Sequence, residues 1–425
     1  MLASHALLYF MWLAWRFHGG AVPHPNGLTD TPAWFARMAG LVVEHAAPTW
    51  EAVAIYGGFL LAQLLAYAWL PGLEVKGLPV PAEGGRQLSY RINGIWAWYL
   101  TLITVLVLHV TGVFPLPRIG ELLGPLMTSA MLVANATAVV LYLGAKLAGR
   151  RRRFPHRSSG SPLYDFFMGV WLNPRIGVVD LKMWAEIRVS WILLFLLTLG
   201  AAATQHAEHG HLSTPMIFML VAHGLYTNAC MKGEECIPTT WDIFREKWGW
   251  MLVFWNLAGV PFLYTFNSWY LASRPPFEHS LPYTIMCFAL LLGAYYVWDT
   301  AQSQRNRFRM MERGTYVERR AFPQLPWGTL RSPRTLETRS GSKLLVDGWW
   351  RYARKIHYTA DVAMALSWGL ICGFDHFLPY LYFSFFVVMI GHRARRDIER
   401  CRRKYGEDWD RYVREVPWLF VPGVV

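Results

Sequence analysis

The chain has 425 residues, of which 54% are hydrophobic and 16% are charged. A soluble domain usually carries about 25% charged residues, so this composition argues against a water-soluble protein. The 22 Trp residues support the same conclusion, because Trp and Tyr favour the boundary between membrane and water. The composition therefore predicts an all-α, multi-pass membrane protein.

The five Cys residues are scattered along the chain and form no CxxC pair. This spacing argues against a disulfide framework and against a thiolate zinc site. A His-rich turn at residues 206–213 has two interpretations, a metal site or a solvated loop. Its His spacing does not match the HExxH zinc pattern, which favours the loop, and we predict no metal.

A membrane helix needs roughly 20 apolar residues. In chain order, the apolar stretches predict such helices near residues 1–17, 50–71, 93–114, 120–147, 186–204, 213–230, 249–271 and 281–300. The last apolar block, 361–391, is too long for one helix and contains Gly369, Gly373 and Pro379. This block predicts a two-helix hairpin, which brings the expected total to about ten membrane helices.

Basic loops stay on the cytoplasmic side of a membrane. Three basic segments stand out, namely Arg150–Arg153 with Arg157, residues 302–358, and residues 393–404. They follow the fourth, eighth and tenth predicted helices, so we expect all three on one side and both termini in the cytoplasm. Attraction of acidic lipids by Lys and Arg at the boundary is an alternative explanation of each cluster.

The third basic segment begins the C-terminal tail. If residues 392–412 form one helix, then Asp397, Cys401, Tyr405 and Tyr412 share a face. Basic residues flank this face: Arg402, Arg403 and Lys404. Aromatic rings, guanidinium groups and a carboxylate suit a nucleotide, because rings stack on a base and Arg grips phosphates. A lipid-binding helix remains the alternative.

Two further segments favour the nucleotide. Arg305 and Arg309 lie four positions apart, just beyond a predicted membrane helix. The stretch at 342–361 then supplies Trp350, His357 and Tyr358. Segments of this kind on one side of a membrane are able to close an anion pocket, and the extra phosphate of NADPH suits the additional Arg residues.

Four acidic residues, Glu234, Glu235, Asp242 and Glu246, lie between two apolar spans. Acids near a membrane interior are costly and usually functional. A buried carboxyl group that stays protonated is able to deliver a proton to an apolar substrate. The alternative is a cytoplasmic loop in which nearby basic residues, Lys232, Arg245 and Lys247, neutralise these acids.

Two stretches carry a resemblance to a known family. The tail "HRARRDIERCRRKYGEDWDRYVREVPWLFVP" and the segment "LLVDGWWRYARKIHY" resemble two signatures of the sterol reductases. This family of integral membrane enzymes includes the carbon-14 and carbon-7 sterol reductases, the lamin B receptor and the 24(28)-sterol reductase of ergosterol synthesis. The resemblance runs from about Pro162 onward. It implies N-terminal transmembrane helices over 1–160 and a reductase half over 161–425.

Three segments look most similar to the 24(28)-reductase branch: "WLNPRIGVVDLKMWAEIR", "NACMKGEECIPTTWDIFREKWGWMLVFWNLAGVP" and "GLICGFD". The carbon-14 and carbon-7 branches typically carry an acid where this chain has Asn256 and an Asn where it has His357. Arg305 replaces a Lys that is common in the other branches, so the positive charge is kept.

The resemblance implies a cytoplasmic-side NADPH pocket that opens to a sterol cavity in the bilayer. By matching position, the implied cofactor residues are Arg305, Arg309, Leu345, Trp350, His357, Tyr358, Asp397, Cys401, Arg402, Arg403, Lys404, Tyr405 and Tyr412. The implied reaction is the last step of ergosterol-type synthesis. That step saturates the 24(28) double bond of the sterol side chain. Such an alkene is not electrophilic enough for hydride attack, so carbon 28 must be protonated before hydride reaches carbon 24. We expect Glu234 or Asp242, with Glu235 next, as the proton source.

Other functions stay open at this point. Reduction at carbon 14 or carbon 7 is one alternative. Isoprenylcysteine carboxyl methyltransferases have a similar tail but are shorter and lack "LLVDGWW". A membrane scaffold similar to the lamin B receptor, or a lipid transporter, is the non-enzymatic alternative. We expect a sterol from the bilayer and membrane lipids as partners, no nucleic acid, and an endoplasmic reticulum membrane in a eukaryote or the inner membrane in a bacterium.

Overall fold

The computed structural model describes residues 1–80, 84–150, 158–318 and 322–424. It consists of two compact units, Met1–Phe277 and Glu278–Val425. Of the basic cluster expected after the fourth helix, Arg151–Arg153 and Arg157 lie outside the described residues. The division at residue 160 inferred from the resemblance falls inside the first unit and stays a prediction about function.

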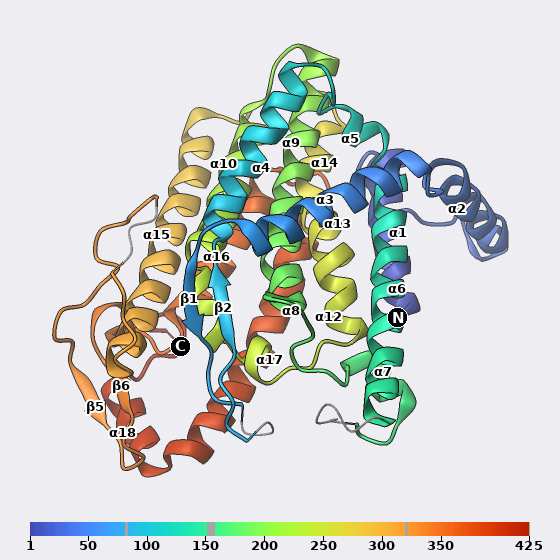
Figure 1. Ribbon diagram of the computed structural model, residues 1–425. Helices are drawn as coiled ribbons and strands as arrows, with labels where there is room; N and C mark the ends of the chain where they lie inside the picture. Colours follow the sequence, from blue (N-terminus) through green and yellow to red (C-terminus); the bar gives the residue numbers. More distant parts are fainter. Residues whose placement is uncertain (81–83, 151–157, 319–321, 425) are drawn as a thin grey trace. The chain divides into compact units, whose positions relative to one another are not determined.

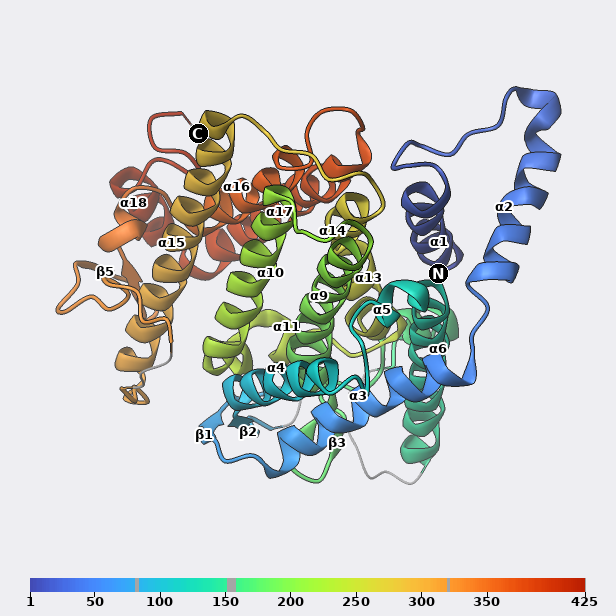
Figure 2. The ribbon, with the colours of Figure 1, turned by 90° about the horizontal axis from the view of Figure 1, so that it is seen from above.

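The first unit is mostly helical (Figures 1 and 2). Its helices are α1 (Leu2–Phe17), η1 (Leu28–Asp30), α2 (Thr31–His45), α3 (Trp50–Trp69), α4 (Gly94–Val110), α5 (Arg118–Glu121), α6 (Leu123–Arg150), α7 (Pro162–Met168), α8 (Leu181–Met183), η3 (Trp184–Val189), α9 (Ser190–His209), α10 (Thr214–Lys232), η4 (Glu234–Thr239), α11 (Trp241–Phe244), α12 (Trp250–Phe254), η5 (Trp255–Gly259), α13 (Val260–Tyr264) and α14 (Phe266–Ala272). Two short antiparallel pairs accompany them: β1 (Leu73–Lys76) with β2 (Ser89–Ile92), and β3 (Arg175–Ile176) with β4 (Val179–Asp180).

Local sequence explains where several of these helices begin and end. The hydroxyl of Thr49 accepts a hydrogen bond from the backbone N–H of Ala52 (3.1 Å) and caps α3. Ser213 caps α10 in the same way, with Pro215 in the first turn, where a missing N–H costs nothing. Gly210 ends α9 with a φ of 76°, a conformation that favours glycine.

Two continuous helical stretches, Leu181–His209 and Trp250–Tyr264, each contain a π-helical turn. η3 joins α8 to α9, and η5 joins α12 to α13. The hydroxyl of Ser190 donates to the carbonyl groups of Ala185 (2.9 Å) and Asn256 (2.8 Å), which links the two π-helices. π-Turns of this kind are rare and occur frequently at functional sites.

The second unit contains α15 (Leu281–Glu312), β5 (Thr335–Glu337), β6 (Lys343–Leu345), η6 (Gly348–Arg351), α16 (Ile356–Leu370), η7 (Leu378–Tyr380), α17 (Leu381–Tyr405) and α18 (Glu407–Glu415). β5 and β6 pair antiparallel. The predicted hairpin at 361–391 is confirmed as two helices, because α16 ends at Leu370 and α17 begins at Leu381. Gly373, with a φ of 79°, lies in the connection.

A helix occupies each of the predicted apolar stretches, so the mostly helical fold is confirmed. Within the described residues, four helices have the length and composition to cross a membrane: Trp50–Trp69, Leu123–Leu147, Leu181–His209 and Leu281–Glu312. Gly94–Val110 is a shorter apolar helix. The total of about ten membrane helices stays a prediction, because several of the others are short or broken by irregular turns. The sequence analysis missed α2 and the strand pairs.

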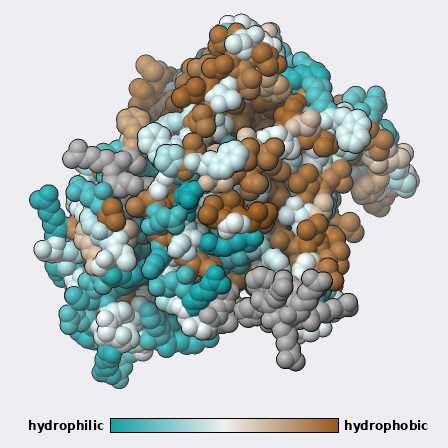
Figure 3. Space-filling model, viewed as in Figure 1, coloured by the Kyte–Doolittle hydropathy of each residue, from teal (hydrophilic) through white to brown (hydrophobic). Residues whose placement is uncertain are grey.

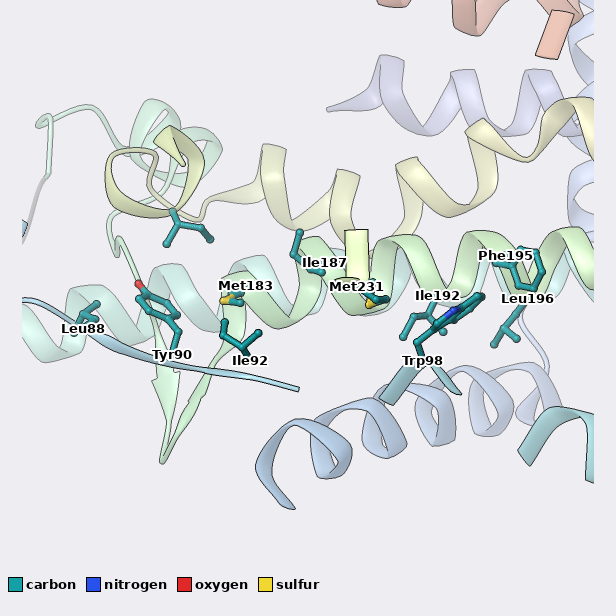
Figure 4. Close-up of a cluster of buried hydrophobic side chains, with 11 residues drawn as sticks. Leu88, Tyr90, Ile92, Trp98, Met183, Ile187, Ile192, Phe195, Leu196 and Met231 are labelled. Carbon is teal, nitrogen blue, oxygen red and sulfur yellow. The ribbon is translucent and has the colours of Figure 1, made fainter. Parts of the chain in front are cut away.

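Apolar side chains cover one exposed face of α4, including Leu100, Ile103, Leu106 and Val110. Figure 3 shows apolar side chains over the upper part of this helix, and hydrophilic ones gathered over β5, β6 and α18. A large apolar surface on a helix is what lipid contact requires. The core of the first unit includes a cluster around Met183, Ile187, Ile192 and Trp98, drawn in Figure 4.

Candidate functional site

The C-terminal end of α15 contacts the segment that runs from β6 to η6. The guanidinium of Arg305 lies over the ring of Trp350, 4.9 Å from its centroid. The indole N–H of Trp350 donates to the carbonyl of Ala301 (3.0 Å), and Arg309 donates to the carbonyl of Lys343 (2.9 Å). Two of the predicted Arg residues thus contact the aromatic segment from one helix, as their spacing of four indicated.

His357 lies beside this stack. Its ring centroid is 5.0 Å from that of Trp350 and 4.2 Å from that of Tyr358, and its side chain is 3% exposed. Burial, together with the charges of Arg305, Lys355 and Arg393, holds the pKa of His357 well below its ordinary value. The imidazole is therefore neutral at pH 7, and its buried Nδ1 atom has no hydrogen-bond partner among the residues that the structure describes.

Asp397 connects α17 to the start of α16. Its carboxylate pairs with the ammonium of Lys355, a residue that is 7% exposed, and with Arg400 (2.6 Å). Burial raises the pKa of Asp397, but the charge and the hydrogen bond of Lys355 outweigh burial and lower the pKa below its ordinary value. The sequence analysis missed Lys355, although its place in "RYARKIHY" between Trp350 and His357 was a signal.

The expectation of one helix over residues 392–412 is wrong. Helix α17 ends at Tyr405 and a second helix, α18, begins at Glu407. Gly406 separates them with a φ of 53°, because glycine enters this region without steric cost. Tyr412 therefore lies on another helix, but it still packs in one apolar cluster with Cys401 and Tyr405.

The remaining tail residues are more exposed. Arg402, Arg403 and Lys404 are exposed, and the ammonium of Lys404 donates to the hydroxyl of Tyr405 (3.0 Å). Burial raises the pKa of the Cys401 thiol, and burial also raises the pKa of Tyr412 to about 12. Both groups are therefore neutral at pH 7.

Leu345, the remaining predicted cofactor residue, lies at the end of β6. It is buried beside Phe308 and Trp350, where it supports the aromatic stack.

The C-terminal segment at residues 418–420 holds the start of α16 in place by hydrogen bonds. The backbone N–H groups of Arg354 and Lys355 donate to the carbonyl groups of Trp418 (2.9 Å) and Leu419 (2.8 Å). The hydroxyl of Thr359 donates to the carbonyl of Phe420 (2.7 Å). The bond from Lys355, the N-cap residue of α16, satisfies a donor that a helix start leaves without an intrahelical partner, and all three bonds anchor the turn that carries Lys355 and His357.

The second unit brings part of the predicted cofactor set into contact, namely Arg305, Leu345, Trp350, His357 and Tyr358, while Cys401, Tyr405 and Tyr412 share one apolar cluster. The chemistry of these side chains fits a nicotinamide dinucleotide phosphate. Arg and Lys side chains suit its phosphates, and the aromatic rings suit its bases. Two buried nitrogen atoms, Nδ1 of His357 and Nε of Arg354, have no hydrogen-bond partner in the described part of the chain, and they suit hydroxyl or amide groups of such a ligand.

The predicted acids lie in the first unit, on the segment from η4 to α11. Glu234 is fully buried and bonded to Arg188 (2.8 Å) and to the backbone N–H of Gly94 (2.7 Å). Glu235 and Asp242 are half-buried. The carboxylate of Glu246 accepts a hydrogen bond from the indole of Trp241 (2.6 Å), a structural contact. The sequence analysis missed Arg188 and Lys182 as partners of this segment.

Replacement of Asp397 tests the charge arrangement at the candidate cofactor site. We expect Asp397→Asn to lower the free energy of unfolding by about 2 kcal/mol at pH 7, because Lys355 loses its carboxylate. The folded-state pKa of Asp397 lies below the unfolded-state value of about 3.9, so its contribution is present above that pH and is lost as the pH falls through the folded-state pKa.

Thermal unfolding in detergent from pH 7 to pH 3 measures this difference. The gap between the wild type and Asp397→Asn should close at the acid end, whereas the matched variant of the exposed Asp410, Asp410→Asn, should show a small effect throughout. A gap that widens as the pH falls contradicts the assignment of a lowered pKa.

Comparison with known proteins gives consistent relatives. The chain is 45% identical over 425 residues to the Delta(24(24(1)))-sterol reductase erg4A of Aspergillus fumigatus, covering 99% of this chain and 89% of the relative. It is 45% identical to the Delta(24(24(1)))-sterol reductase of Gibberella zeae, covering 99% and 70%. It is 35% identical to the Delta(14)-sterol reductase of the bacterium Methylotuvimicrobium alcaliphilum, covering 100% and 93%. The profile of the ergosterol biosynthesis ERG4/ERG24 family matches residues 1–425, and the chain belongs to this family.

Proposed function

We propose that this protein is an NADPH-dependent sterol reductase that saturates the 24(28) double bond of a sterol side chain. Carbon 28 and carbon 24(1) are two names for the same exocyclic carbon, so the proposal agrees with the names of the two relatives at 45% identity. Reduction at carbon 14 is the second candidate, because relatives at 35% identity carry that name. The higher identity favours the side-chain reaction.

One observation carries the cofactor part of the proposal. In the second unit, cationic side chains lie beside aromatic rings and a neutral His357, and two buried nitrogen atoms there have no partner within the described ranges. We assign Arg305, Arg309 and the exposed tail cations to the phosphates of NADPH, and Trp350, His357 and Tyr358 to its rings and ribose. Bound NADPH would supply the hydride that carbon 24 receives.

The protein's part in the reaction is to deliver a proton without admitting water. An isolated alkene does not accept hydride, so a carboxylic acid first protonates carbon 28. The resulting tertiary cation at carbon 24 requires an environment from which water is excluded. We assign the proton to Asp242, with Glu235 as the second choice. Both carboxylate oxygens of Glu234 already accept hydrogen bonds, three in all, from Arg188 and Gly94, so we do not assign the proton to Glu234.

The apolar helices support a location in a membrane, where the sterol is dissolved. We propose the endoplasmic reticulum membrane for a eukaryotic host, or the inner membrane for a bacterial one, with both termini in the cytoplasm. Membrane lipids and the sterol substrate are the expected partners.

The assignment of Arg305 is testable by measuring the affinity for the cofactor. We expect Arg305→Gln to raise the Kd for NADPH by about tenfold or more, because a charged hydrogen bond to a phosphate is lost. The matched control is Arg307→Gln, two positions away on α15, since Arg307 bonds Thr329 instead. Titration calorimetry in detergent with NADPH and NADH measures both variants. Equal losses in the two variants would contradict a specific role for Arg305.

The regiochemistry is testable with a panel of sterols. The purified protein and NADPH are incubated with a 24(28)-methylene sterol, a 14-ene sterol and a 7-ene sterol, and the products are separated by gas chromatography and mass spectrometry. We expect loss of the 24(28) double bond alone, and a decrease of at least about a hundredfold in Asp242→Asn. Reduction at carbon 14 would support the second candidate instead, and reduction at carbon 7 would contradict both.

A further inference from the structure

We propose that Lys182 and Arg188 are positioning residues that hold the acid-bearing segment, residues 234–246, at its two ends. We also assign Glu234 to this clamp and not to proton transfer. The inference rests on the proposed function, because it concerns how the proton donor is held. Its physical basis is independent of the substrate.

The acid-bearing segment cannot hold its own shape. It contains the 3₁₀-helix η4 with Pro238 inside it and the four-residue helix α11. Helices this short form few internal hydrogen bonds and leave most of their terminal backbone groups without intrahelical partners. The segment therefore depends on anchors from other parts of the first unit.

Lys182 provides the anchor at the far end. Its side chain is fully buried, and its ammonium donates to the carbonyl groups of Asp242 (2.6 Å), Ile243 (2.9 Å) and Glu246 (2.7 Å). A Lys ammonium has three N–H donors, so all of them are used on this one turn of chain. The bonds fix the backbone of Asp242, the residue to which we assign the proton.

Arg188 provides the anchor at the near end. Its guanidinium donates to Oε1 of Glu234 through Nε (3.0 Å) and Nη2 (2.8 Å), and both side chains are fully buried. Oε2 of Glu234 accepts from the backbone N–H of Gly94 (2.7 Å), at the start of α4. The carboxylate thus also neutralises a helix N-terminus, where negative charge is favoured.

Asn93 extends this anchor to a third helix. Its Oδ1 atom accepts from Arg188, and its Nδ2 atom donates to the carbonyl groups of Tyr67 (3.2 Å) and Leu70 (2.7 Å) at the end of α3. The guanidinium of Arg188 also lies 4.1 Å from the ring centroid of Tyr67. Glu234 therefore belongs to a network that joins α3, α4, η3 and η4.

The burial of Lys182, Arg188 and Glu234 is better explained by a role in positioning the acid-bearing segment than by a gain in stability. Removing an Arg–Glu pair from water costs several kcal/mol, and an apolar pair of similar volume is often as stable or more so. Lys182 and Arg188 lie six positions apart, and each is bonded to one end of the acid-bearing segment. This arrangement is explained if the segment must adopt one conformation.

The test uses four variants of the full-length protein in detergent. Arg188→Met and Glu234→Gln each break the buried pair, the double variant Arg188→Met/Glu234→Gln removes both charges, and Lys182→Met removes the second anchor. Lys76→Met, at an exposed Lys of β1 in the same unit, is the control for loss of a positive charge. The measurements are kcat and KM for the 24(28)-methylene sterol, the Kd for NADPH, and the rate of tryptic cleavage after Arg245 and Lys247.

We expect Lys182→Met to decrease kcat by at least about tenfold and to speed tryptic cleavage by a similar factor, with the Kd for NADPH within about twofold of the wild type. The single variants Arg188→Met and Glu234→Gln should lose activity, and the double variant should recover most of it, since no unpaired charge remains.

Two results would overturn the inference. A double variant as inactive as Glu234→Gln alone would make Glu234 a proton donor, and unchanged cleavage in Lys182→Met would show that the segment does not need this anchor. Failure of the proposed function is distinguishable, because the wild type would then reduce no sterol while the cleavage rates still report on the clamp.

Discussion

The structure depends on the partners of a few charged side chains that are buried among apolar helices. Removing an ammonium or a guanidinium from water costs several kcal/mol, which only close partners offset. Lys182, Arg188 and Lys355 are each less than a tenth exposed, and each has such partners: three carbonyl groups, Glu234, and Asp397. These contacts fix the segments that carry the chemistry we propose. Each unit therefore contains a buried polar centre whose charges have close partners.

The two polar centres differ in chemistry. In the first unit, Glu234 is bonded to the buried Arg188, whereas Glu235 and Asp242, to which we assign proton delivery, lie half-buried on short helices. In the second unit, cations gather around aromatic rings, and burial together with the nearby charges of Arg305, Lys355 and Arg393 keeps His357 neutral. A neutral imidazole beside several cations leaves the positive charge available to an anionic ligand.

Much of the fold could be predicted from the sequence, because apolar length is a direct signal. The hairpin of α16 and α17 follows from an apolar block that is too long for one helix and contains glycines and a proline. The tail was less predictable. The spacing of Asp397, Cys401 and Tyr405 was correct for one helix, but Gly406 ends α17, and Tyr412 reaches the same apolar cluster from α18.

The partners of the charged residues were beyond sequence reasoning, since they come from distant positions. Lys232, Arg245 and Lys247 lie close to the acids in sequence, whereas Glu234 pairs with Arg188, 46 positions earlier. Lys182 bonds backbone carbonyl groups, a contact that leaves no mark on side-chain pattern. The residues that we predict to bind the cofactor carried a stronger signal, because aromatic and basic residues alternate over short stretches, and the fold places Arg305 beside Trp350 and His357.

The central claim is that carbon 28 receives a proton and carbon 24 receives a hydride. The most direct measurement is reduction of a 24(28)-methylene sterol in D₂O with unlabelled NADPH, followed by location of deuterium in the product by NMR. We expect one deuterium at carbon 28 and none at carbon 24. Deuterium at carbon 24, or its absence from carbon 28, would contradict it.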